Sequence, residues 1–389
     1  MKKRLFLAAL AGLALAGCVK NEVADSVKES KPVAFESPVL YSNVNTGTKA
    51  EYKGEIGSFT YGGSTGTYLY PREEHFRIFA VQHEGNFNTW AEATACAFNG
   101  QAIAYDGSLD AWAPKKQADK SYYYWPDGKM LSFAAFSPAD LQQTNKDAAP
   151  TYSGTGFVLE NFVVADNPAD QFDMLFSERI VDQTSSNMVN NPTYYSGIPI
   201  VFKHALTSIH FSLVKEQSVT EEVYLTGITL KNVINKGTFV ENITNEKAYA
   251  SAPYWTESTA AQDVKDYVSF TGSVEFPLSV QYVSSLAEKD TDAEGENEIS
   301  HPLLLLPQAL SNNVQLVINY KVGDEAKTKT VQLNQYPKGS NKTPITEWAI
   351  GTRYTYRITY GKSSEMQDII YFSPSTEGWK DVLGIEIVL

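Results

Sequence analysis

The sequence predicts an all-β chain that folds into two β-sandwich domains in tandem. Nearly every segment after residue 31 alternates apolar and polar side chains with a period of two, which is typical of half-buried strands. Turn-forming pairs such as Asn99-Gly100 and Gly323-Asp324 separate these runs, and no stretch carries a helical apolar stripe over three turns. The 389 residues exceed what one sandwich ordinarily uses, so we expect two.

The beginning of the chain has the features of an export signal. Basic residues at positions 2–4 precede an apolar run over residues 5–16, which is too short for a membrane span and has the length of a secretory signal. The run ends in a Leu-Ala-Gly sequence before Cys18, which resembles the lipobox of bacterial lipoproteins. The resemblance implies a signal peptide over residues 1–17, cleavage between Gly17 and Cys18, and a lipid on Cys18. An ordinary signal peptide that happens to end in Cys is the alternative.

The domain organisation follows from shifts in composition. Residues 18–31 are polar and charged without periodicity, so we expect a tether. The polar stretch 183–192 is the best boundary, because an apolar strand begins soon after it, at Ile198. We therefore expect an N-terminal sandwich over residues 32–190 and a C-terminal sandwich over residues 191–389.

Alternation predicts which side chains share one face of each strand. In chain order, these sets are Val33, Phe35, Val39 and Tyr41; Ile209, Phe211 and Leu213; Leu316, Ile318, Tyr320 and Val322; Tyr354, Tyr356, Ile358 and Tyr360; and Leu383, Ile385, Ile387 and Leu389.

Charge and cysteine content exclude several partner classes. The formal net charge of −13 becomes −16 once the three basic residues of the signal segment are removed, and so negative a surface repels phosphate backbones. We therefore expect no nucleic acid as a partner. Two cysteines cannot build a disulfide framework, and we expect Cys96 to be a buried structural thiol.

Motifs for catalysis or metal binding lack the context that they need. Ser64 lies in a Gly-x-Ser-x-Gly pattern. A nucleophile elbow requires a helix after this serine, and the residues that follow do not predict one. Residues 290–295 imitate the start of an EF-hand loop, but the twelfth position is His301 instead of Glu. We expect a hydrogen-bonded structural role for His204. The chain is thus predicted to be no enzyme and to hold no cofactor and no metal.

Behind the lipobox, the segments that matter follow in this order: Phe76–Val81, Tyr124–Pro126, Leu131–Pro138, Ile200–His204, Leu206–Phe211, Ile228–Leu230, Gly237–Phe239, Leu303–Pro307, Trp348, Tyr354–Ile358, Ile370–Pro374 and Trp379. Together these segments resemble the fimbrillin family, which comprises lipoprotein precursors of type V pili in Bacteroidota. The resemblance implies two transthyretin-like β-sandwich domains, a structural role, and a place at the outer membrane and in the fimbrium. It also implies other pilus subunits as partners and allows a host or bacterial surface ligand.

The family resemblance implies polymerisation by strand exchange. A protease removes the N-terminal strand of each subunit, which opens an apolar groove, and a strand near the C-terminus of another subunit fills it. Here the removable strand would be Pro32–Tyr41, in which Pro38 suits a sheet edge, and residues 32–49 would be lost by cleavage between Lys49 and Ala50. The candidate donor side chains are Leu383, Ile385, Ile387 and Leu389.

One departure from the family leaves alternatives open. The best-known members are processed after Arg, yet residues 19–71 contain no Arg. Either a protease that accepts Lys acts at Lys49, or the subunit keeps its N-terminal strand and serves as a lipid-held anchor or tip adhesin. A glycan-binding surface lipoprotein and a hydrolase that uses Ser64 are the remaining rivals.

Overall fold

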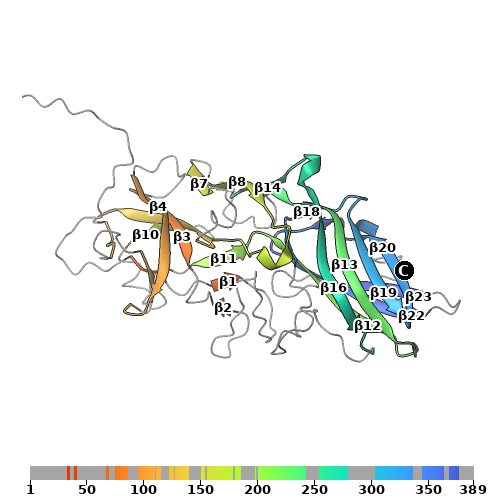
Figure 1. The fold of residues 1–389 in the computed structure, drawn as a ribbon. Helices are drawn as coiled ribbons and strands as arrows, with labels where there is room; N and C mark the ends of the chain where they lie inside the picture. The colour runs from red at the N-terminus through yellow and green to blue at the C-terminus, as the bar shows by residue number, and fades with distance from the viewer. Residues whose placement is uncertain are drawn as a thin grey trace, which may run out of the picture.

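The computed structural model describes the strands of both halves of the chain, together with the turns that join many of them (Figure 1). The residues described are 33–35, 39–41, 67–69, 75–85, 95–109, 111–114, 122–126, 128–139, 150–153, 156–177, 180–184, 198, 200–241, 254–278, 303–335, 344–362 and 368–375.

A nine-stranded sheet contains most strands of the first half. Its order is β2-β1-β11-β9-β6-β3-β4-β5, and β10 pairs with β6 beside this path. The bounds are β1 Val39–Tyr41, β2 Thr67–Leu69, β3 Phe76–His83, β4 Ala95–Asp106, β5 Ala111–Ala113, β6 Met130–Ser137, β9 Leu175–Ser177, β10 Ile180–Gln183 and β11 Val201–His204.

The central strands β3 and β6 are apolar on both faces because each face covers a different core. Ile78 and Phe133 belong to one apolar cluster, while Phe79 and Phe136 belong to the other and stack on each other at 6.0 Å between ring centroids. Strands that are buried on both sides lose the polar half of the alternation. The near-continuous apolar sequence of β6 is therefore the expected pattern for the middle of this sheet.

The second half builds two four-stranded sheets that share one core. One has the order β17-β12-β22-β23 and the other β16-β13-β19-β20. Tyr320 of one sheet lies 5.9 Å from Tyr360 of the other between ring centroids, so the sheets pack face to face. The bounds are β12 Thr207–Lys215, β13 Val223–Ile234, β16 Val264–Glu275, β17 Leu303–Leu305, β19 Gln315–Val322, β20 Glu325–Gln332, β22 Arg353–Lys362 and β23 Asp368–Ser375.

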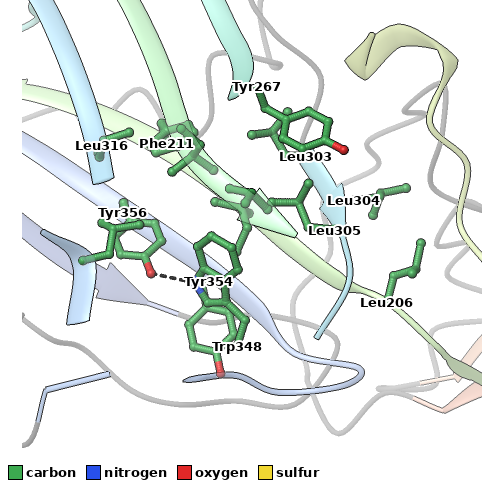
Figure 2. Packing of buried hydrophobic residues seen from close by; sticks show 14 of the residues in the cluster. Leu206, Phe211, Tyr267, Leu303, Leu304, Leu305, Leu316, Trp348, Tyr354 and Tyr356 are labelled. Atoms are coloured by element: carbon green, nitrogen blue, oxygen red, sulfur yellow. Dashed lines mark hydrogen bonds between the residues drawn. The ribbon is translucent and has the colours of Figure 1, made fainter. Parts of the chain in front are cut away.

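The alternation predicted for β12, β19 and β22 is confirmed. Alternate residues of β12, β19 and β22 are buried in one cluster, part of which is drawn in Figure 2. The indole Nε1 of Trp348 donates a hydrogen bond of 2.8 Å to the hydroxyl of Tyr356 inside this core. β12 and β22 pair in parallel, with Ile209 opposite Tyr354 and Phe211 opposite Tyr356. A parallel pair needs a long crossover between its strands, which local sequence patterns do not specify.

Two smaller sheets and three 3-10 turns complete the described part of the fold. One sheet has the order β15-β14-β8-β7 and the other pairs β18 with β21. The bounds are β7 Pro150–Ser153, β8 Gly156–Val163, β14 Lys236–Val240, β15 Trp255–Glu257, β18 Gln308–Ala309, β21 Glu347–Trp348, η2 Pro168–Asp170, η4 Ala261–Asp263 and η5 Leu333–Gln335. With no α-helix among these residues, the all-β prediction is confirmed.

Pairing crosses the predicted domain boundary in both directions. β11 lies after residue 190, yet it pairs with β9 and β1 in the nine-stranded sheet. β8 lies before that residue and pairs with β14. At the junction, Nδ1 of His204 lies 2.7 Å from Oδ2 of Asp173, and both side chains are buried. The hydrogen-bonded structural histidine is thus confirmed, while the division into domains stays a prediction.

Of two turns predicted from glycine-containing pairs, one is a turn in the structure and the other is a bulge within a strand. Gly323 and Asp324 form the two-residue turn between β19 and β20, and Gly323 has a φ of +58°, as expected for glycine at the first position of a hairpin turn. The turn expected at Asn99-Gly100 is wrong, because β4 runs through both residues. Gly100 has a φ of +66° at a register shift against β3, so this glycine produces a β-bulge.

Candidate functional site

The segment Val33–Phe35 is inserted into the first core with hydrogen bonds on both of its sides. The amide of Phe35 donates to the carbonyl of Trp112 at 2.7 Å, and the amide of Trp112 donates back at 3.0 Å. On the other side, the amide of Ile198 donates to the carbonyl of Ala34 at 2.8 Å. The amide of Val33 donates to the carbonyl of Tyr123 at 2.7 Å. The segment therefore bridges β5 to the chain that leads into β11.

The strand that follows is also held on two sides. β1 pairs in parallel with β11, with Val39 opposite Val201, and it pairs antiparallel with β2, with Val39 opposite Leu69. Pro38 predicts a position at a sheet edge for this strand. The described residues on both sides of Pro38 have neighbours on two sides, so they occupy an interior position in the sheet.

Side chains of the segment form part of the apolar core. Val33 and Phe35 are fully buried and belong to the cluster that also holds Phe76 and Phe133, as the predicted alternation requires. The ring of Phe35 lies edge-on to Phe133 at 5.3 Å and to Phe76 at 6.2 Å between centroids. Burial of each such side chain stabilises the fold by roughly 2–3 kcal/mol, and each backbone hydrogen bond contributes about 1 kcal/mol net.

The surroundings of the segment have the chemistry of a strand acceptor. Without residues 33–35, two backbone groups of Trp112, the amide of Ile198 and the carbonyl of Tyr123 would lose their partners. An unpaired polar group in an apolar setting costs about 1–3 kcal/mol. A groove of this kind is satisfied by another extended segment, which supplies both the hydrogen bonds and the apolar side chains.

Most other predicted site residues lie outside the described part of the chain. These are the signal and lipidation residues Gly17 and Cys18, the candidate cleavage residues Lys49 and Ala50, and the candidate donor residues Leu383, Ile385, Ile387 and Leu389. For Val39 and Tyr41 the structure describes the backbone in β1. Of the predicted exchange residues, the structure therefore describes only those of the N-terminal segment, with the side chains of Val33 and Phe35 and the backbone of Val39 and Tyr41.

The residues that bond to Val33–Phe35 were not singled out from the sequence. Trp112 is nearly completely buried in a strand of three residues, and Ile198 pairs with Phe35 through a single bridge. The available signal was an Ala-Trp-Ala sequence shortly after the turn at Asp106-Gly107. That signal predicts a short strand, but it cannot say which distant segment lies beside it.

Three tyrosines with raised pKa values lie in the packed core. Burial raises the pKa of the Tyr356 hydroxyl, although the hydrogen bond from Trp348 opposes the shift. Burial likewise raises the pKa of Tyr354 and of Tyr267. Among the residues that the structure describes, no group of three or more His, Cys, Asp or Glu side chains could hold a metal ion. No helix in the described ranges is long and apolar enough to cross a membrane.

Comparison with solved structures finds chains with a similar course but low sequence identity. A fimbrial protein from Bacteroides vulgatus is 17% identical, with a TM-score of 0.48, over 78% of this chain and 92% of its own. A protein from Bacteroides uniformis, provisionally described as a cell adhesion protein, is 14% identical, with a TM-score of 0.47, over 90% of this chain and 98% of its own. None of the curated proteins compared with the chain matches it.

A family model provides the assignment. The model described as fimbrillin-like matches residues 71–379, which is well over half of the chain. The match includes β5, β11 and the whole of the second core. The chain belongs to the fimbrillin-like family.

Proposed function

We propose that this chain is a structural, non-enzymatic pilus subunit that polymerises by strand exchange and supports adhesion at the cell surface. Cleavage between Lys49 and Ala50 would release residues 32–49 and vacate the groove between β5 and β11. A strand from another subunit would then fill that groove. The observation that carries the proposal is the position of Val33–Phe35, which is hydrogen-bonded on both sides and fully buried at Val33 and Phe35.

The donor in this proposal is the C-terminal segment with Leu383, Ile385, Ile387 and Leu389. Its alternating apolar side chains could replace those of the N-terminal strand in a neighbour's groove. The lipid on Cys18 would hold the precursor at the outer membrane before cleavage. Other pilus subunits would be the partners, with a host or bacterial surface ligand as the target of adhesion.

Durability of such a joint depends on kinetics more than on affinity. A strand of ten residues contributes about 1 kcal/mol for each hydrogen bond and roughly 2 kcal/mol for each buried side chain. The cost of ordering the strand is of similar size. A filled groove therefore persists because the core must open before the strand can leave.

The test is controlled cleavage of the mature chain. A site-specific protease sequence replaces residues 43–48, and the cut protein is run on SDS gels without boiling. We expect a ladder of SDS-resistant oligomers from the cut protein and monomer alone from the uncut protein. The matched variant lacks residues 384–389 and should be cut equally well yet give no ladder. A cut, folded protein that stays monomeric would refute strand exchange.

The absence of Arg over residues 19–71 favours a second candidate, an uncleaved lipoprotein that anchors the pilus or carries an adhesin at its tip. A glycan-binding surface lipoprotein belongs to the same uncleaved class. N-terminal sequencing of the protein from cell surfaces separates the candidates, because an uncleaved chain begins at Cys18 and a trimmed chain begins at Ala50.

A further inference from the structure

We propose that the groove selects its occupant by a three-residue pattern, aliphatic–small–aromatic, in which the aromatic side chain fills the slot of Phe35. This inference rests on the proposed function, because only a vacated groove can receive another strand. The occupant that fits is an extended segment of a neighbouring subunit that carries this pattern.

The slot of Phe35 is built from aromatic rings. Phe35 is edge-on to Phe76 at an interplanar angle of 83° and to Phe133 at 88°. Phe133 is itself edge-on to Trp125, and Phe76 to Phe202. Edge-to-face pairs depend on the charge distribution of both rings and contribute about 0.5–1.5 kcal/mol beyond apolar burial. An aliphatic side chain in this slot loses those contacts and leaves unfilled volume.

The position before the slot accepts only a small side chain. Ala34 is 5% exposed and packs in a cluster with Ala111 and Ala113 of β5. This cluster lies apart from the one that holds Phe35, since successive residues of a strand point to opposite faces. A larger side chain would have to displace Leu109 and Tyr122, which pack against this cluster. Val33 then returns to the face of Phe35, fully buried, where an aliphatic side chain fits.

Backbone bonding fixes which residue enters the slot. Phe35 and Trp112 exchange two hydrogen bonds, and Ile198 bonds to Ala34 on the other side. A strand that satisfies these groups cannot shift by one residue, because its side chains would change faces. An incoming strand must therefore present its own aromatic residue at this one position.

The chain's own C-terminus meets only part of the requirement. Leu383-Gly384-Ile385 is aliphatic–small–aliphatic, and residues 383–389 contain no aromatic side chain. The groove should therefore still accept a second copy of this C-terminus, as the proposed function requires, but prefer a neighbour whose strand carries the aromatic residue.

Peptide exchange in the full mature chain tests this selectivity. The chain is cut within residues 43–48, which leaves the N-terminal strand seated, and is then incubated with an excess of fluorescent peptide covering residues 31–41. Incorporation is measured by gel filtration and intact mass. We expect the native peptide to enter. The Phe35→Leu and Ala34→Leu peptides should enter at least tenfold less, and the matched control Val33→Ile should stay within about threefold of native.

A second pair of peptides examines the C-terminal segment. The native 380–389 peptide should enter at least tenfold less than the 31–41 peptide. At least one of the peptides Leu383→Phe, Ile385→Phe and Ile387→Phe should recover entry. Equal entry of the Phe35→Leu and native 31–41 peptides would overturn the selectivity but leave strand exchange intact. Failure of every peptide to enter, including the native one, would show that no vacated groove is available, and it would overturn the proposed function as well.

Discussion

Phe35 links the N-terminal strand to the first core through one fully buried ring. Replacing it by Ala removes the edge-to-face contacts and leaves a cavity, so the free energy of unfolding should fall by about 3–5 kcal/mol. Chemical denaturation followed by tryptophan fluorescence measures the change. Val268→Ala is the control, because Val268 is 48% exposed and its truncation should cost less than about 0.5 kcal/mol. Equal effects of the two variants would contradict the buried position of Phe35.

The buried tyrosines predict loss of stability in alkali. Burial raises the pKa of Tyr356, so its hydroxyl stays protonated in the folded state while the unfolded chain loses that proton above about pH 10. The folded state then binds more protons, and the free energy of unfolding falls by about 1.4 kcal/mol per pH unit for each such residue. Below pH 10 this contribution is fully present.

Tyr356→Phe should reduce the alkaline slope that denaturation at pH 9 to 11 records. At neutral pH it should cost about 1–3 kcal/mol, because Trp348 loses the acceptor of its hydrogen bond. An unchanged slope would show that Tyr356 ionises equally in the folded and unfolded chain.

The burial of single residues could be predicted where it depends only on the two-residue period of a strand. Val33 and Phe35 share a buried face, as alternation predicts. Their partners Trp112 and Ile198 were not predictable, because the contacts join segments roughly 80 and 160 residues away, and local patterns carry no information about such pairing.

At the scale of elements, β20 shows how an exposed edge strand is protected. Its pairing with β19 places Lys327 opposite Tyr320 and Lys329 opposite Ile318, on the face that turns toward the core. Inward-pointing charges of this kind oppose pairing with another chain. Replacing both lysines by Val should cause self-association in sedimentation velocity experiments. The control is the double substitution Thr328→Val and Thr330→Val on the other face of the same strand. This variant should stay monomeric.

Elements were predicted best where alternation runs unbroken along a strand and least well where a bulge interrupts it. Strands β12, β19 and β22 follow the alternation closely. β4 was expected to end at Asn99-Gly100, but a bulge carries it on to Asp106. Glycine with a positive φ serves a turn and a bulge equally well, so the sequence alone does not distinguish them.

At the scale of the whole molecule, the described fold uses its own N-terminal strand to complete a sheet built from distant segments. The all-β class and family membership were accessible from the sequence, because alternation and ordered motifs extend along most of the chain. The interior position of the N-terminal strand was not accessible, because it depends on β5 and β11 closing around that strand.

The most direct test of the central claim is the N-terminal sequence and intact mass of subunits recovered from SDS-resistant polymers. If the groove between β5 and β11 is where subunits join, polymerised subunits should begin at Ala50 and lack residues 33–41. Polymers whose subunits retain residues 33–41 would contradict the account, because the groove would still hold its own strand.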